Sequence, residues 1–199
     1  MNWKKYSSQT KIFSFLILFA LTSNLSSDIE DNIALHKEQF SEVALKIWEY
    51  AELGYQETKS SNLLASELEK EGFKITKGVA GIPTAFVAEF GSSGPMIGIL
   101  GEFDALPGLA QTNSPFKEVA INDSGGGHAC GHHLFGAASA WAAVSIKEWL
   151  VENDIDGTVR FYGTPAEEGG SGKVYMVREG LFDDVDVVLH WHPDDVNSA

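Results

Sequence analysis

The densest group of chemically reactive side chains lies in residues 125–133, with the sequence GGGHACGHH. Half of the six histidines and the only cysteine fall within six consecutive positions of this segment. Thiolate and imidazole are preferred ligands of zinc and of neighbouring transition metals, and the flanking glycines let the backbone bend tightly. A lone cysteine is more often a small buried hydrophobe, but its place among histidines favours metal ligation for Cys130. A helix-capping loop with chance histidines is the structural alternative.

Carboxylates form a second group, and they occur in two separate segments. Glu167 and Glu168 lie in TPAEEGG, residues 164–170. In extended chain, adjacent side chains point in different directions, so one carboxylate can bind a metal while its neighbour reaches a bound water. Glu102 and Asp104 lie one residue apart in GEFDALP, where they could bind a metal or orient a ligand. Taken alone, each pair is better explained as a solvated surface feature.

A fourth segment, VVLHWHP at residues 187–193, places two histidines directly after a strand-like apolar run. For His190 or His192 alone, a structural role is the default. The four segments together are more informative, because each places ligand-type side chains after a predicted strand. Cysteine, histidine and glutamate in one site favour a mixed metal centre for Zn or Mn, compatible with two ions. The sequence contains no Gly-x-Ser-x-Gly or His-Glu-x-x-His motif.

The elements that must position these segments alternate between strands and helices. Helical spacing of apolar residues begins at Ile33 and stops at Gly54, and further helices are predicted for Glu57–Glu71, His133–Val151 and Lys173–Glu179. Short runs typical of strands cover Phe73–Thr76, Thr84–Phe90, Met96–Leu100, Thr158–Tyr162 and Val185–His190. Residues 101–127 are predicted to form a long, functional loop. The pattern predicts an α/β fold, a mostly parallel sheet flanked by helices, with the site at the carboxyl ends of its strands.

Composition narrows the classes of function. Of the 199 residues, 44% are hydrophobic and 11% aromatic, which is typical of a globular protein rather than a disordered one. A formal net charge of −14 makes nucleic acid an unsuitable partner, because phosphate binding needs clustered lysine and arginine. A single cysteine excludes an internal disulfide framework.

Residues 1–27 have the organisation of a secretory signal peptide. Three lysines precede a short apolar run, residues 12–21, and small and polar residues follow it. The run is too short for a comfortable membrane span, so we expect cleavage, no stable span in the mature protein, and export to the periplasm or beyond. An uncleaved N-terminal anchor is the alternative.

The segments GEFDALPGL, GGGHACGHH, GTPAEEGG and VVLHWHP, in this order and at these spacings, resemble the two-metal aminoacylase and carboxypeptidase superfamily, in particular its amidohydrolase branch. WEYAELGYQETKSS, residues 48–61, is similar to the N-terminal helix-turn-helix of that branch, so the resemblance covers about residues 33–199. It implies a metal-dependent hydrolase that cleaves the amide bond of small-molecule N-acyl amino acids such as aminobenzoyl-glutamate. Each complete site would hold two divalent ions, Zn or Mn.

The resemblance also implies roles for individual residues. Cys130, His132, Glu168 and His190 correspond to metal ligands, and Glu167 corresponds to the general base.

The same resemblance bears on three further residues. Asp104 matches a supporting aspartate of the catalytic site. His133 replaces the aspartate that is commoner in the branch, which suggests substrate binding for it rather than metal ligation. Glu102 stands where many superfamily members carry a histidine, so the resemblance leaves a ligand role for this segment in doubt.

Members of the superfamily are more than twice as long as this chain and are homodimeric. They insert a lid and dimerisation domain after the strand near His190, and a later segment returns with one more histidine ligand. The resemblance therefore implies that residues 28–199 form the N-terminal part of a catalytic domain, in a truncated or split form that a second polypeptide completes. Two alternatives stay open: a related metallo-exopeptidase acting on dipeptides, and a non-catalytic metal-binding remnant.

Overall fold

The structure is a computed structural model, and it describes residues 30–121 and 124–196. The predicted signal peptide, residues 1–27, lies outside the described residues. Within the described ranges, no helix is long and apolar enough to cross a membrane.

The predicted helices are confirmed, with small differences at their ends. The chain is helical at residues 30–35, and the helices that follow are α2 (Lys37–Tyr50), α3 (Thr58–Lys70), α4 (His132–Glu152), α5 (Glu167–Gly170) and α6 (Gly172–Arg178). Helix α2 ends before the expected Gly54, because Ala51 adopts a left-handed conformation with φ of 42° and its N–H bonds to the Ile47 carbonyl. A short 3-10 helix, η1 (Val79–Gly81), follows the first strand.

The five main strands form one mixed sheet in the order β1-β2-β6-β3-β7. Their bounds are Lys74–Lys77 (β1), Phe86–Phe90 (β2), Met96–Gly101 (β3), Thr158–Gly163 (β6) and Val187–Leu189 (β7). Strand β3 is parallel to both β6 and β7, whereas β2 is antiparallel to both β1 and β6. Four strands of this sheet therefore share one direction and only β2 opposes them, which confirms the predicted α/β fold with a mostly parallel sheet.

Two short strands pair with each other within the long segment after β3. Strand β4 (Leu106–Pro107) pairs antiparallel with β5 (Gly126–Gly127). A Cβ atom on Gly127 would lie 2.0 Å from the carbonyl oxygen of Leu109, so only glycine fits here. This pairing brings the Cys- and His-rich segment beside the carboxyl end of β3.

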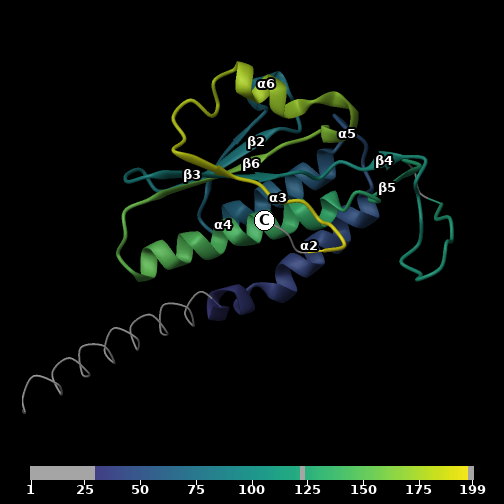
Figure 1. The fold of residues 1–199 in the computed structure, drawn as a ribbon, viewed down its shortest axis with the longest axis horizontal. Helices are drawn as coiled ribbons and strands as arrows, with labels where there is room; N and C mark the ends of the chain where they lie inside the picture. The colour runs from purple at the N-terminus through teal and green to yellow at the C-terminus, as the bar shows by residue number, and fades with distance from the viewer. Residues whose placement is uncertain (1–29, 122–123, 197–199) are drawn as a thin grey trace, which may run out of the picture.

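Helices cover both faces of the sheet. In Figure 1, α2, α3 and α4 lie on one side and α6 lies on the other. The side chains of β6 alternate accordingly: Val159 and Phe161 belong to the core beneath α2, α3 and α4, whereas Tyr162 packs with Met176 on the opposite face. Helix α4 approaches the strand ends closely, because a Cβ on Gly136 would lie 2.6 Å from the Glu102 carbonyl oxygen.

A buried carboxylate, Glu57, connects the start of α3 to the segment after β6. The residue is 0% exposed. Its Oε1 accepts a hydrogen bond from the Ala166 N–H at 2.7 Å, and its Oε2 accepts one from the Thr84 hydroxyl at 3.0 Å. Ala166 has φ of 56°, a conformation that is strained for a residue with a Cβ. Glu57 thus stabilises an unfavourable turn directly before Glu167.

Replacing Glu57 with Gln should remove a pH-dependent part of the free energy of unfolding. Burial raises the pKa of Glu57 from 4.5 to about 7, although hydrogen bonds to Ala166 and Thr84 oppose the shift. A raised native pKa gives a contribution that is complete below pH 4.5 and is lost as the pH rises to about 7. The loss is on the order of 3 kcal/mol.

Urea unfolding of the wild type and of Glu57→Gln at several pH values between 4.5 and 8 measures this contribution. The free energy of unfolding of Glu57→Gln should increase relative to that of the wild type as the pH rises. The exposed Glu49 of α2 offers a matched control, since Glu49→Gln should follow the wild-type curve. Parallel curves for the wild type and Glu57→Gln would contradict the expectation.

Candidate metal centre

His132, the first residue of α4, is the centre of the site. Its imidazole is completely buried. The Nδ1 atom lies 2.9 Å from Asp104 Oδ1 and 3.1 Å from the Asp104 carbonyl oxygen. Ionised carboxylate and carbonyl oxygens only accept hydrogen bonds, so Nδ1 carries a hydrogen and donates it. In the neutral ring, Nε2 then holds the free lone pair, which is the arrangement that prepares a histidine for metal ligation.

Three carboxylates from two strand ends surround the Nε2 atom of His132. Glu102 Oε2 lies 2.9 Å away, Glu167 Oε2 lies 3.8 Å away, and Glu168 Oε1 lies 3.9 Å away. The structure therefore brings the predicted ligands His132 and Glu168 together with the predicted base.

The prediction that Glu167 and Glu168 point in different directions is wrong, because they do not lie in extended chain. They begin α5 after the left-handed Ala166. The Glu168 N–H donates to Asp104 Oδ2 at 2.9 Å, which fixes the turn against the end of β3. Both carboxylates consequently face the same imidazole nitrogen.

The charged groups at this centre shift one another's pKa values. Burial opposes protonation of His132, but Asp104 and Glu102 outweigh it and raise the pKa of the imidazole to about 10. Burial would raise the pKa of Glu102, yet His132 and Lys173 outweigh that effect and lower it to about 2. In the absence of an ion, the proton on His132 therefore neutralises part of the negative charge.

The buried donor atoms fit a cation. Glu102 Oε2, His132 Nε2 and Glu168 Oε1 are all buried. The first two form an ion pair at 2.9 Å, and apart from it none of the three atoms has a hydrogen-bond partner among the described residues. Unsatisfied buried polar atoms are costly and uncommon in folded proteins. Two donors that each lie ~2.1 Å from one ion are ~3.0 Å apart at a right angle and ~3.4 Å apart at the tetrahedral angle. The observed separation is close to the lower of these values.

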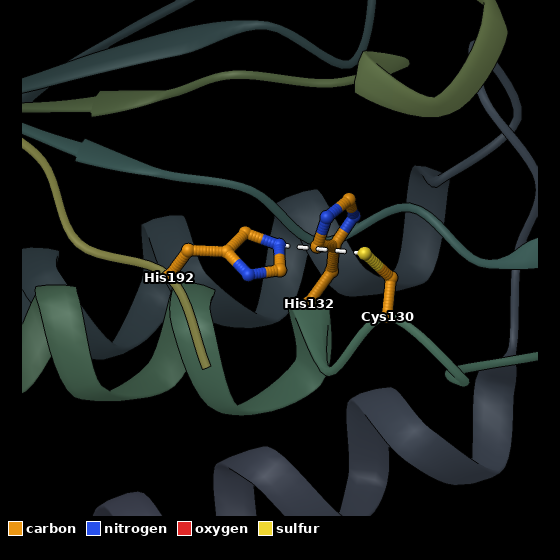
Figure 2. Close-up of side chains that lie close together, drawn as sticks. All are labelled: Cys130, His132 and His192. Carbon is orange, nitrogen blue, oxygen red and sulfur yellow. Dashed lines mark hydrogen bonds between the residues drawn. The ribbon is translucent and has the colours of Figure 1, made fainter. Parts of the chain in front are cut away.

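Sulfur and nitrogen donors lie next to the carboxylates. Figure 2 shows Cys130, His132 and His192 directed toward one another, with 3.3 Å between Cys130 Sγ and His192 Nε2. Donor atoms of all three residues lie within 4.8 Å of one another. Burial raises the pKa of the Cys130 thiol to about 11, and the carboxylate of Glu168 adds to the shift. A bound cation would reverse this effect, because metal ligation displaces the thiol proton.

His190 and His133, the remaining predicted site residues, lie at the margin of the cluster. His190 Nε2 is 3.6 Å from Glu102 Oε1, and its ring packs at 89° to the ring of Phe135. His133 faces His128, with 5.2 Å between ring centroids, and burial lowers its pKa to about 4. Ligation by His190 and substrate binding by His133 stay predictions.

Sequence reasoning missed three residues at this centre. His192 was given no ligand role, yet its Nε2 atom lies 3.3 Å from the thiol of Cys130. Lys173 forms a direct ion pair with Glu102 Oε1. Glu57 fixes the turn at Ala166 from more than a hundred residues away in the sequence. His192 lies in the VVLHWHP segment, and Lys173 lies on a predicted helix just after the Glu167 segment, so both carried a usable signal, whereas Glu57 carried none.

Comparison with known proteins agrees with this geometry. The profile of peptidase family M20/M25/M40 matches residues 98–198. A p-aminobenzoyl-glutamate hydrolase of Escherichia coli, named as one subunit of that enzyme, is 47% identical over 166 residues, which cover 83% of this chain and 34% of that protein. The hippurate hydrolase of Campylobacter jejuni is 32% identical over 77% of this chain and 39% of its own length.

Solved structures show the same fold. The YXEP protein of Bacillus subtilis, described as a dinuclear metal-binding peptidase of family M20, is 31% identical with a TM-score of 0.66, over 81% of this chain and 44% of that one. An aminobenzoyl-glutamate utilization protein of Klebsiella pneumoniae has a TM-score of 0.57 at 15% identity, over 81% of this chain and 45% of that one, which supports the fold alone. The chain spans little more than a third of the length of the curated relatives named above. Because the family profile covers half of the sequence, including the histidine, cysteine and glutamate segments, the chain belongs to the peptidase family M20/M25/M40.

Proposed function

We propose that this chain contributes the metal-binding part of an amidohydrolase that cleaves the amide bond of N-acyl amino acids such as aminobenzoyl-glutamate. The observation that carries the proposal is the orientation of His132: Asp104 fixes Nδ1, and Nε2 faces Glu102, Glu167 and Glu168. The E. coli and C. jejuni relatives support it, because their names describe hydrolases of aminobenzoyl-glutamate and hippurate. Both of those compounds are N-acyl amino acids.

The proposed mechanism divides the work between ligands and a base. Cys130, His132, Glu168 and His190 would hold a divalent ion, which would supply polarisation of the scissile carbonyl and acidification of a water. Glu167, whose side chain is 44% exposed, takes a proton from the water and passes it to the leaving amine. Asp104 keeps a hydrogen on Nδ1 of His132, so that Nε2 stays available as a donor.

Metal number and identity are part of this proposal. The description of the B. subtilis neighbour as dinuclear supports two ions in each complete site. A donor set of thiolate, imidazole and carboxylate suits Zn or Mn. His133 is proposed to contact substrate, because it lies beside His132 and its buried Nδ1 has no hydrogen-bond partner within the described part of the chain.

The proposal also covers the partners of this protein and its location in the cell. The E. coli relative is named as one subunit of its hydrolase, which supports a second polypeptide that completes the site. From the family resemblance, we propose that the complete enzyme is a homodimer. We also propose export through residues 1–27. Periplasmic fractionation of cells followed by N-terminal sequencing of the protein should locate the mature start after the apolar run, whereas recovery only in the cytoplasm with Met1 in place would contradict export.

Activity is best tested in a chimera, because the chain matches about a third of the length of its relatives. Residues 28–199 would replace the matching part of the E. coli protein, which is 47% identical. With Zn or Mn added, the chimera should release glutamate from aminobenzoyl-glutamate. Failure of a folded, metal-loaded chimera to hydrolyse this substrate or other N-acyl amino acids would favour the non-catalytic metal-binding alternative.

Substitutions in this chimera should separate the base from the ligand. Glu167→Gln should lower kcat by about 10²–10⁴-fold, the usual contribution of a general acid–base group, with nearly unchanged metal content. Glu168→Gln should instead lose metal. Elemental analysis beside steady-state kinetics measures both effects. Equal metal loss in the two variants would show that the assigned roles are wrong.

Replacing the thiol should weaken metal binding in the chain itself. Cys130→Ser should reduce Zn affinity by more than about tenfold, because even residues that only support ligands change affinity by about 10–100-fold. Titration against a competing chelator measures the change. A separate group of donors at His36, Glu71 and Glu148 provides the control, since His36→Gln should leave the high-affinity site intact. Loss of binding in His36→Gln but not in Cys130→Ser would place the metal elsewhere.

A further inference from the structure

Glu102 is the carboxylate nearest to the Nε2 atom of His132 among the described residues that form ion pairs with this imidazole. The residue is 2% exposed at the end of β3. Its Oε2 atom lies 2.9 Å from His132 Nε2, at least 0.9 Å closer than either of the carboxylates after β6. The Oε2 atom is buried and, apart from this ion pair with His132, has no hydrogen-bond partner within the described part of the chain.

The other oxygen of Glu102 is already occupied. Lys173, whose side chain is 28% exposed, forms an ion pair with Oε1, and His190 Nε2 lies 3.6 Å from the same atom. The two oxygens therefore face different groups. Lys173 fixes the rotation of the carboxylate, and the fixed carboxylate directs Oε2 at His132.

Three separate segments of the chain bring possible metal-donor atoms together at this point. His132 follows the Cys-rich loop, Glu102 directly follows β3, and Glu167 follows β6, yet donor atoms of these three residues lie within 4.8 Å of one another. A buried carboxylate oxygen of this kind is stable only when a cation or a hydrogen-bond donor satisfies it.

We propose that Glu102 is a ligand of the metal ion held by His132, with Oε2 as its donor atom and Lys173 keeping the carboxylate monodentate. The inference rests on the metal centre of the proposed function, but not on its amide substrate. It assigns to the segment after β3 a ligand role that the family resemblance leaves in doubt.

The test is metal binding by the 199-residue chain, measured by chelator competition for Zn²⁺ and by the absorption bands of bound Co²⁺. Glu102→Gln should lower Zn²⁺ affinity by at least about tenfold and shift the Co²⁺ ligand-field bands. Glu102→His should retain most of the affinity with altered bands, because an imidazole nitrogen replaces the oxygen donor. Circular dichroism of each metal-free variant verifies folding.

Lys173→Met provides a second, independent variant, since its partly exposed side chain can lose its charge without opening the core. If Glu102 is a ligand, release of Oε1 changes the binding mode of the carboxylate and shifts the Co²⁺ bands. Wild-type Zn²⁺ affinity together with wild-type Co²⁺ bands in Glu102→Gln would overturn the proposal. If Glu102→Gln fails to fold, unchanged Co²⁺ bands in Lys173→Met would overturn it. A wild-type chain that binds no Zn²⁺ would overturn the metal centre itself, whereas an inactive but metal-loaded chimera would leave the Glu102 result standing.

Discussion

The carboxylate of Asp104 connects the two halves of the site, and each of its oxygens has a different task. Oδ1 accepts the hydrogen of His132 Nδ1, and Oδ2 accepts the N–H of Glu168. Asp104 is 1% exposed, so water competes little for either bond. Through one side chain, the start of α4 and the turn after β6 are held at a fixed separation. The positions of the imidazole and of both glutamates follow from that separation.

Parallel pairing of β3 with β6 makes this connection possible. Gly101 at the end of β3 lies opposite Gly163 at the end of β6, so Glu102 and Thr164 leave the sheet at the same edge. Both glycines are required by packing. A Cβ on Gly101 would lie 2.5 Å from the Phe161 ring, and one on Gly163 would lie 2.2 Å from the Phe86 ring. The aromatic core beneath the sheet thus packs directly against the ends of both strands.

Much of this arrangement could be predicted from the sequence, because hydrophobic patterning determines the strands and the strands determine where the motifs meet. The convergence of Cys130, His132 and Glu168 followed from that reasoning. The directions of Glu167 and Glu168 did not, since they depend on the left-handed Ala166 and on its bond to Glu57, a contact between residues 109 positions apart. The burial of Glu102 depends on α4 and Lys173, and nothing in the local sequence marks it.

The order of strands in the sheet has a consequence for how the chain folds. Strands β2 and β3 are neighbours in sequence but not in the sheet, because β6 lies between them. Until residues 158–163 are available, both strands have an unpaired edge, and only contacts between distant parts of the chain can satisfy these edges. Insertion of β6 joins β2 to β3 and brings Glu168 to Asp104 in the same step. The metal centre is therefore formed together with the sheet. A nascent chain in which β6 is not yet in place has no site that can bind a metal ion.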